Sequence, residues 1–396
     1  MRYSLETKHL LSRLGEHAEN GARAVLLGQV PKFAAQVISM VALARLLNPE
    51  DFGIVAIVSG ITLALSPLVD GGLSNSTIQS ERITQDQISS LFYVNFTLGA
   101  ALAILLFACA PLIAEIYNDT RLIPISYALS TIFIMNALSL QSIALLRRQM
   151  RFKEIAIVDA GSTCVSVVVA IYLASTGWSH WSLVAMLIGT TGFSALGYIL
   201  LCGWFPSRPR IRTVVGHHLK LGARATVASF LARLHESASA LMLGLVGNPF
   251  TVGLLNRSQT IVSIPQTQLL APIHSVAQPT LSRLANEPER FGRAVLALIR
   301  RATLATSYFA ILIFSTPDLI VQIFLGASWE AASPYLRILS LSLVLLPATA
   351  VIQTALLALG RPDALIRARA AQLALGVTAL ALGTFTGAYG AIAAIA

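Results

Sequence analysis

The chain is dominated by apolar runs that are each long enough to cross a lipid bilayer as an α-helix. A helix needs about 20 residues to span roughly 30 Å of hydrocarbon, and eleven such runs follow one another along the sequence. Barrel strands would be about half as long, and unpaired backbone groups are not tolerated in lipid. We therefore predict an all-α polytopic membrane protein. The runs lie near residues 24–46, 53–77, 88–117, 122–146, 155–176, 181–204, 222–246, 250–276, 294–325, 333–359 and 364–387.

The composition supports a membrane location and excludes other classes of function. Hydrophobic residues make up 55% of the chain and charged residues only 12%, whereas about 25% is usual in soluble proteins. The net charge is +10, but the basic residues fall between apolar runs and form no surface domain, so we predict no nucleic-acid partner. Cys109, Cys164 and Cys202 lie singly inside apolar runs, which predicts buried thiols and no metal or cofactor site.

The basic residues also predict the orientation of the chain in the membrane. One set of alternate connections, with their flanking turns, holds 22 lysines and arginines, whereas the other set holds only Arg45, Arg121 and Arg337. The positive-inside rule places the richer set and the N-terminus in the cytoplasm, in a bacterial inner membrane. Residues 1–20 have mixed charge and no signal peptide, so we predict a cytoplasmic or interfacial segment there.

The two halves of the chain resemble each other. Residues Asn48–Gly53 and Asn248–Gly253 both carry an Asn-Pro pair followed by glycine, at an offset of 200. Because six spans separate equivalent positions, the halves share one orientation and are related by an axis along the membrane normal. Later matches occur in the same order: Tyr117 with Phe324, Pro124 with Pro334, Ala144–Leu146 with Ala355–Leu357, and Thr176–Gly177 with Thr386–Gly387.

This repeat predicts two parallel-related six-helix lobes around a central cavity. We expect an N-terminal lobe at residues 21–204, a basic cytoplasmic linker at 205–220 and a C-terminal lobe at 221–396. The second lobe would hold five helices and the start of a sixth at Ala388, so we expect the natural chain to continue beyond residue 396.

Three of the predicted spans carry a polar face at helical spacing. Hydrogen bonds between helices would explain the serines, threonines and glutamines taken singly, so a structural role for each stays open. The three faces are Gln29, Lys32, Gln36 and Ser39; Ser59, Thr62, Ser66 and Asp70; and Asn256, Gln259, Ser263 and Gln266.

Charged side chains inside the spans are harder to explain, because each costs roughly 2.5–3.5 kcal/mol at mid-bilayer. Lys32 and Asp70 lie at similar depth and can pair, and Arg233 and Glu236 are three apart on one helix. Arg257 then has no obvious acid. The resulting cation excess suits an anionic substrate, although a purely structural role for the set remains the alternative.

The charged and polar residues predict a site with substrate-binding residues and ion-coupling residues. Three other residues are interpreted as lying outside this site: Glu115 and Asp159 as solvated residues near span ends, and His274 as a core histidine. His235, beside Glu236, is a candidate carrier of a coupling proton. The predicted substrate-binding residues are Lys32, Arg233, Arg257, Gln29 and Gln259, and the predicted ion-coupling residues are Asp70, Glu236 and His235.

Four segments together resemble the polysaccharide flippases of the multidrug/oligosaccharidyl-lipid/polysaccharide exporter superfamily. The resemblance covers nearly the whole chain, and it rests on the order of the segments and not on any one motif. The segments are Leu43–Gly53, Asp70–Leu73 with Ile78 and Gln79, the basic run Leu145–Lys153, and Pro279–Leu284.

The resemblance implies a flippase of the Wzx type that moves a polyprenyl-pyrophosphate-linked oligosaccharide by alternating access. By position, Arg233 and Arg257 resemble arginines common in the family's seventh and eighth spans, and Glu236 stands where an aspartate is usual. Asp70 matches directly, whereas His235 has no functional counterpart. The family's usual twelfth to fourteenth spans are missing. The implied partners are membrane lipids, with a polysaccharide polymerase and glycosyltransferases as candidates.

Two other functions remain open at this point. A drug exporter of the same superfamily would favour net acidic charge for cationic drugs, against the cation excess. A membrane enzyme that polymerises or ligates glycans would need a large outer loop with catalytic residues, but the outer connections are only a few residues long. We therefore predict a transporter and not an enzyme.

Overall fold

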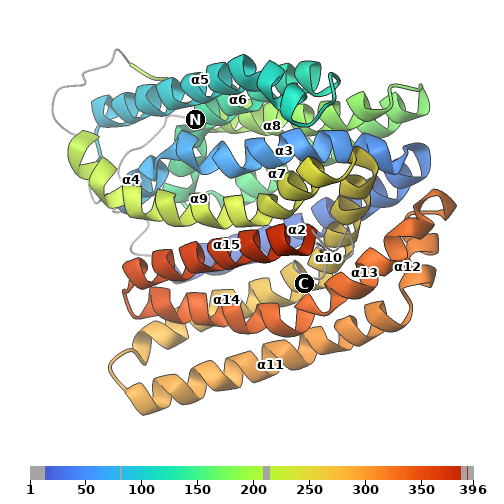
Figure 1. Ribbon diagram of the computed structural model, residues 1–396. Helices are drawn as coiled ribbons and strands as arrows, with labels where there is room; N and C mark the ends of the chain where they lie inside the picture. The colour runs from blue at the N-terminus through green and yellow to red at the C-terminus, as the bar shows by residue number, and fades with distance from the viewer. Residues whose placement is uncertain (1–13, 81–82, 208–214, 385–389, 391–396) are drawn as a thin grey trace. The chain divides into compact units, whose positions relative to one another are not determined.

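The computed structural model describes residues 14–80, 83–207, 215–384 and 390, and every element assigned in this part of the chain is a helix (Figure 1). The all-α prediction is therefore confirmed. Three predicted segments lie wholly or partly outside the described residues: the twelfth span except residue 390, most of the segment 1–20, and residues 208–214 of the linker. The helices are α2 (Leu14–Leu46), α3 (Pro49–Asp70), α4 (Leu73–Gln79), α5 (Gln85–Ile116), α6 (Leu122–Arg148), α7 (Phe152–Ser175), α8 (His180–Cys202), α9 (Val215–Val246), α10 (Pro249–Arg283), α11 (Pro288–Ser315), α12 (Pro317–Phe324), the 3₁₀ helix η1 (Ala327–Ala332), α13 (Ser333–Ser340), α14 (Ser342–Ala358) and α15 (Pro362–Thr384).

In the described part of the chain, helices lie at all eleven predicted runs, but three runs are broken. The second breaks between α3 and α4 at Gly71 and Gly72, whose φ angles of 56° and 73° suit glycine. The ninth breaks at Pro317, which has no N–H to donate and begins α12. The tenth bends by 46° between the segments 327–340 and 342–358.

The chain divides into two compact units. The first unit comprises Met1–Leu47 and Ile61–Arg233, and the second comprises Asn48–Gly60 and Leu234–Ala396. Helices α3 and α9 therefore each contribute residues to both units. The lobe boundaries expected from the repeat, 21–204 and 221–396, remain a prediction.

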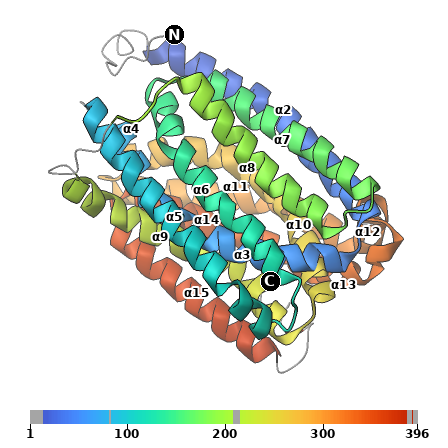
Figure 2. The same ribbon diagram turned by 90° about the horizontal axis from the view of Figure 1, so that it is seen from above.

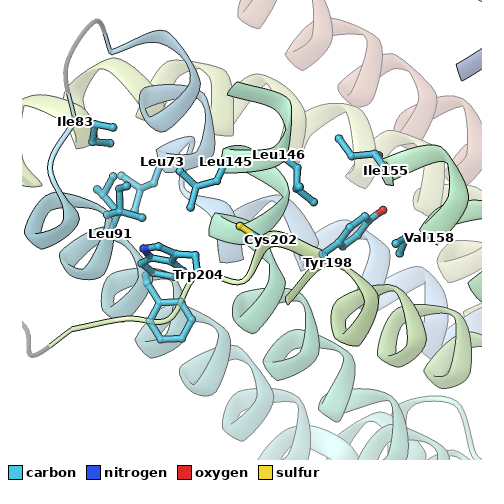
Figure 3. Close-up of a cluster of buried hydrophobic side chains, with 12 residues drawn as sticks. Leu73, Ile83, Leu91, Leu145, Leu146, Ile155, Val158, Tyr198, Cys202 and Trp204 are labelled. Carbon is cyan, nitrogen blue, oxygen red and sulfur yellow. The ribbon is translucent and has the colours of Figure 1, made fainter. Parts of the chain in front are cut away.

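In the first unit, a buried apolar cluster joins α4, α5, α6, α7 and α8 (Figure 3). Trp204, just after α8, packs edge-on against Phe92 of α5 with ring centroids 5.9 Å apart. Cys202 is buried in this cluster, as predicted, whereas Cys109 and Cys164 are only partly buried. The packing here joins the C-terminal ends of α6 and α8 to the N-terminal ends of α5 and α7.

In the second unit, the two copies of the Asn-Pro-Gly repeat contact each other. A Cβ atom at Gly53 would lie 1.6 Å from the carbonyl oxygen of Pro249, and one at Gly253 would lie 1.8 Å from that of Pro49. Asn248 caps α10 by accepting a hydrogen bond from the Thr251 N–H at 3.0 Å. The repeated residues thus bring the first turns of α3 and α10 together in a reciprocal contact.

Candidate functional site

The polar face predicted on α2 is partly accessible. Gln29 and Gln36 are exposed, whereas Ser39 is buried and donates a hydrogen bond to Met186 Sδ at 3.3 Å. Lys32 lies between them, with its side chain 32% exposed. The face therefore combines an accessible half, which carries the charge, with a buried half that packs against α8.

Lys32 pairs with Asp159 of α7 and not with Asp70. Lys32 Nζ lies 3.7 Å from Asp159 Oδ2, and the Tyr198 hydroxyl of α8 donates a hydrogen bond to Asp159 Oδ1. The proposed Lys32–Asp70 pair is therefore not formed. The interpretation of Asp159 as a solvated residue is incomplete, because its side chain is 37% exposed but also joins three helices.

Small residues bring these three helices together. A Cβ at Gly28 of α2 would lie 2.7 Å from the Ala156 side chain of α7, and one at Gly197 of α8 would lie 2.8 Å from Val158. Lys32 is one turn beyond Gly28, and Tyr198 follows Gly197, so both side chains meet Asp159. Figure 2 shows α2 and α7 side by side along their length.

Asp70 has a local structural partner. It is the last residue of α3, and its carboxylate accepts hydrogen bonds from the backbone N–H of Ser74 at 2.9 Å and from the Ser74 hydroxyl. Because Ser74 is in the first turn of α4, Asp70 satisfies a donor at the start of that helix. Its predicted role in ion coupling remains a prediction.

A buried polar network links the end of α3 to α6 within the first unit. Asn95 donates to the backbone carbonyls of Val69 and Asp70 at 3.1 and 3.3 Å. Gln141 donates to Asn95 Oδ1 at 3.3 Å and accepts from the Thr77 hydroxyl at 2.8 Å. Asn95, Gln141 and Thr77 are all fully buried. Sequence reasoning missed this network, because single polar residues within apolar runs show no periodic pattern.

Arg148 completes this network at the C-terminus of α4. It was counted among the cations of a cytoplasmic connection, but its side chain is only 9% exposed. Its guanidinium donates to the carbonyl oxygens of Thr77, at 2.9 Å, and Ser80. A cation that binds the last carbonyls of a helix also complements the helix dipole. Arg148 is therefore a structural residue of the first unit.

In the second unit, a second charged cluster joins α9, α14 and α15. Arg369 of α15 lies close enough to Glu236 of α9 for their charges to interact, and it donates to Gln353 Oε1 of α14 at 3.4 Å. The His235 ring packs against Gly376, where a Cβ would lie 3.2 Å from its Cε1 atom. Arg369 had been counted with a cytoplasmic connection and its flanking turns. It lies about two turns inside α15, and this depth was the signal that could have identified it.

The three predicted cationic and acidic residues of α9 differ in exposure. Arg233 and Glu236 are exposed within this structure, whereas His235 is partly buried. Of these, Arg233 has the accessibility that a ligand-binding cation needs. Its spacing of three from Glu236 places both on one face of α9.

Arg257 of α10 packs within the second unit. Its guanidinium carbon lies 4.3 Å from the ring centroid of Phe52, and Nη2 donates to Asn256 Oδ1 at 3.1 Å. Phe52 in turn packs edge-on against the buried Trp329 with ring centroids 5.2 Å apart. Within the described part of the chain, Arg257 Nε is buried and has no hydrogen-bond partner. These cation–π and packing contacts favour for Arg257 the structural role that the sequence left open as the alternative for the charged set.

Gln259 also has an intramolecular partner. Its side-chain amide donates to the Ser239 hydroxyl of α9 at 2.9 Å, and Ser239 is buried. This hydrogen bond joins α9 to α10, which is the structural role that the sequence left open for the polar residues of the three faces. It leaves the Gln259 carbonyl oxygen available to a further donor.

Most of the charged residues of the predicted site lie on three long helices. In the described chain, seven helices are long and apolar enough to span a membrane, or eight if the bent pair 327–340 and 342–358 counts as one span. The long helices α2, α9 and α10, which lie at three of the predicted runs, carry charged side chains within their sequence. They are the helices that carry Lys32, His235, Glu236 and Arg257. These helices therefore hold most of the charged candidate residues, Lys32 in the first unit and His235, Glu236 and Arg257 in the second.

An apolar cavity of about 350 Å³ lies elsewhere in the first unit. It is lined by residues of α6, α7 and α8 together with Trp178 in the connecting loop. None of the predicted site residues lines it, so it does not suit an anionic group. Among the described residues, no group of three or more His, Cys, Asp or Glu side chains is placed to hold a metal ion.

The comparison with protein families identifies the chain. The model of a family described as polysaccharide biosynthesis protein matches residues 42–334, which is well over half of the chain. The chain belongs to this polysaccharide biosynthesis protein family. The resemblance inferred from the four sequence segments is thereby confirmed at the level of the family.

Relatives of this family member have names in polysaccharide biosynthesis. The lipopolysaccharide biosynthesis protein WzxC of Escherichia coli is 23% identical over 82% of this chain and 67% of its own length. The succinoglycan biosynthesis transport protein ExoT of Rhizobium meliloti is 24% identical over 80% of this chain and 64% of its own length. The chain thus spans about two thirds of the length of these relatives.

Solved structures of membrane proteins share the fold of this chain. The lipid II flippase MurJ is 16% identical, with a TM-score of 0.77 over 93% of this chain and 84% of that chain. A multidrug resistance transporter of the MATE family is 15% identical, with a TM-score of 0.74 over 92% of this chain and 90% of that chain. Together with the apolar helices, these likenesses make this family member a polytopic membrane protein.

Proposed function

We propose that this protein flips a polyprenyl-pyrophosphate-linked oligosaccharide across a bacterial inner membrane for polysaccharide biosynthesis. The match to the family over residues 42–334 carries this proposal. The names of the relatives, which include a lipopolysaccharide biosynthesis protein and a succinoglycan biosynthesis transport protein, support the same substrate class. Transport by alternating access requires no covalent chemistry, so we assign no catalytic residue.

Lys32 and Arg233 are the strongest candidates to bind the pyrophosphate. Both are cations within predicted spans, and both are at least partly exposed. Gln29 is exposed one turn from Lys32 and is placed to bind sugar or phosphate oxygens. Arg257 and Gln259 are weaker candidates, since each already makes contacts within the second unit.

The acidic and histidine residues are proposed to couple transport to an ion. Glu236 and His235 are adjacent on α9, and the charge of Arg369 lies near Glu236. An ion that binds to Glu236 would weaken its interaction with Arg369, and this change would alter the contact between α9 and α15. Asp70, the last residue of α3, is a further candidate.

The remaining features of the proposal follow from the charge pattern. We propose that the N-terminus lies in the cytoplasm, because 22 cations gather on that set of connections. We also propose that a polysaccharide polymerase and glycosyltransferases act before or after this protein. They would supply and consume the lipid-linked glycan.

The experiment is export of a lipid-linked glycan in a bacterial strain that lacks its own flippase. The chain should restore the surface polysaccharide, and Lys32→Ala and Arg233→Ala should each reduce export more than tenfold at unchanged membrane abundance. Lys153→Ala is the matched control, because Lys153 is an exposed cation in the first turn of α7. Resistance to cationic drugs without restored glycan export would support the drug-exporter alternative instead.

A further inference from the structure

The pairing of Lys32 with Asp159 shows that a predicted substrate-binding cation has an internal anion. The two side chains are 32% and 37% exposed, so neither is sealed in the packed interior of the first unit. In the described chain, this carboxylate is the acidic partner that the structure gives to Lys32. A substrate phosphate that binds Lys32 must therefore compete with Asp159.

The distance between the charges leaves room for this competition. Lys32 Nζ and Asp159 Oδ2 are 3.7 Å apart, which is longer than the usual 2.7–2.9 Å for a charge-assisted hydrogen bond. The ammonium has three donors and a flexible four-carbon stem, so it can turn toward a second anion with little strain. The pair is thus formed but loose.

The carboxylate, in contrast, is held in place. Its Oδ1 atom accepts the hydrogen bond of Tyr198, whose side chain is buried, while Oδ2 faces Lys32. Figure 3 shows Tyr198 of α8 beside Val158, the neighbour of Asp159 on α7. The close contact of Gly197 with Val158 fixes this arrangement. When Lys32 turns away, Asp159 therefore keeps a hydrogen-bond donor.

We propose that Asp159 is the resting counter-ion of Lys32 and is replaced by a phosphate group of the substrate. This inference rests on the proposed flippase function and adds a residue to which the sequence analysis gave no role in binding. A partly exposed lysine without a counter-ion would attract any cellular anion. Competition from Asp159 thus weakens the binding of any anion to Lys32. A pyrophosphate, with more than one negative charge, displaces Asp159 more easily than a singly charged anion does.

Tyr198 sets the strength of this competition. Its hydrogen bond stabilises the carboxylate when Lys32 is absent, so it makes the release of Lys32 easier. Removal of the hydroxyl should therefore strengthen the Lys32–Asp159 pair, whereas removal of the Asp159 charge abolishes the pair. The two changes should shift substrate affinity in opposite directions.

The test measures binding of farnesyl pyrophosphate to the full chain in lipid nanodiscs. Asp159→Asn should lower Kd roughly two- to fivefold, the range expected for loss of one partly exposed competing ion pair. Tyr198→Phe should raise Kd about twofold, and Lys32→Ala about tenfold or more. Farnesol, which has no phosphate, should bind all variants equally.

Asp119→Asn is the matched control, because Asp119 pairs with Arg121 at 2.8 Å in the connection between α5 and α6, far from Lys32 in the sequence. It should leave Kd unchanged. Thermal unfolding of each variant shows that the change in Kd comes from folded protein. A Kd that rises or stays the same in Asp159→Asn, or that falls in Tyr198→Phe, overturns the counter-ion role. The flippase function would survive that result, since failure of the unmodified chain to restore glycan export is what overturns it.

Discussion

Gly53 and Gly253 occupy equivalent positions in the second turn of α3 and α10, and each faces the carbonyl group of the proline that begins the other helix. A Cβ atom at either position would lie within 1.6–1.8 Å of that oxygen. Because the obstacle is backbone, no side-chain rotation can relieve the overlap. Two helices that are 200 residues apart in the sequence can therefore approach this closely only if both copies of the repeat keep glycine.

Substitution of either glycine should destabilise the second unit strongly. Gly53→Ala or Gly253→Ala should lower the free energy of unfolding by about 3 kcal/mol, the upper end of costs for overpacking. The measurement is the thermal unfolding midpoint in detergent, together with membrane abundance. Gly161→Ala is the control, since no atom lies within 4 Å of a Cβ at that helical position. Equal midpoints for Gly53→Ala and Gly161→Ala would contradict the close contact.

Arg148 and Arg147 should respond differently to the same change. Arg148 binds buried carbonyl groups at the end of α4, whereas the neighbouring Arg147 is exposed. Arg148→Met should lower the free energy of unfolding by about 1–3 kcal/mol, because it leaves buried acceptors without their donor. Arg147→Met should change it by less than about 0.5 kcal/mol. Thermal unfolding of both variants checks this, and similar losses would show that Arg148 acts only through its charge.

The orientation in the membrane can be tested by labelling with an impermeant thiol reagent in intact cells. Single cysteines replace Arg147 and Trp178 in a chain without its three native cysteines. Both positions are exposed, whereas Arg148 is buried and would react poorly on either side. We expect labelling at 178 and protection at 147, as the positive-inside rule requires. The reverse pattern would invert the predicted topology.

The helices could be predicted because lipid imposes a simple physical rule. Backbone groups in hydrocarbon must be paired within the segment, so a long apolar run has one solution. The breaks inside the runs were harder to see. Gly71, Gly72 and Pro317 stand at them, but glycine and proline also occur inside helices of this chain, as at Pro31 and Pro67.

The partners of the charged residues could not be predicted in the same way. Depth along a helix suggested Asp70 for Lys32, but helices at one depth have several neighbours. The actual choice of Asp159 depends on the close packing of Gly28 with Ala156, which is a property of the folded unit. The exposed Arg233 and the stacked Arg257 looked alike in the sequence, because periodicity does not reveal whether a polar face meets an aromatic ring.

Substitution of Arg233 should therefore affect substrate binding, whereas substitution of Arg257 should affect the stability of the fold. Arg233→Ala should abolish glycan export at normal membrane abundance, because it removes a ligand charge from an exposed position. Lys should restore export only in part, since it lacks the planar fork that grips phosphate oxygens.

Arg257→Ala should instead lower membrane abundance and the unfolding midpoint. It removes a cation–π contact with Phe52, worth about 0.5–2 kcal/mol, and leaves a gap in the packing around that ring. Arg257→Lys should keep the cation near Phe52 and recover part of the stability. The measurements are export in the flippase-deficient strain and thermal unfolding of the purified variants. Normal stability with no export in Arg257→Ala would return Arg257 to the substrate site, because only the loss of a ligand contact could then explain the defect.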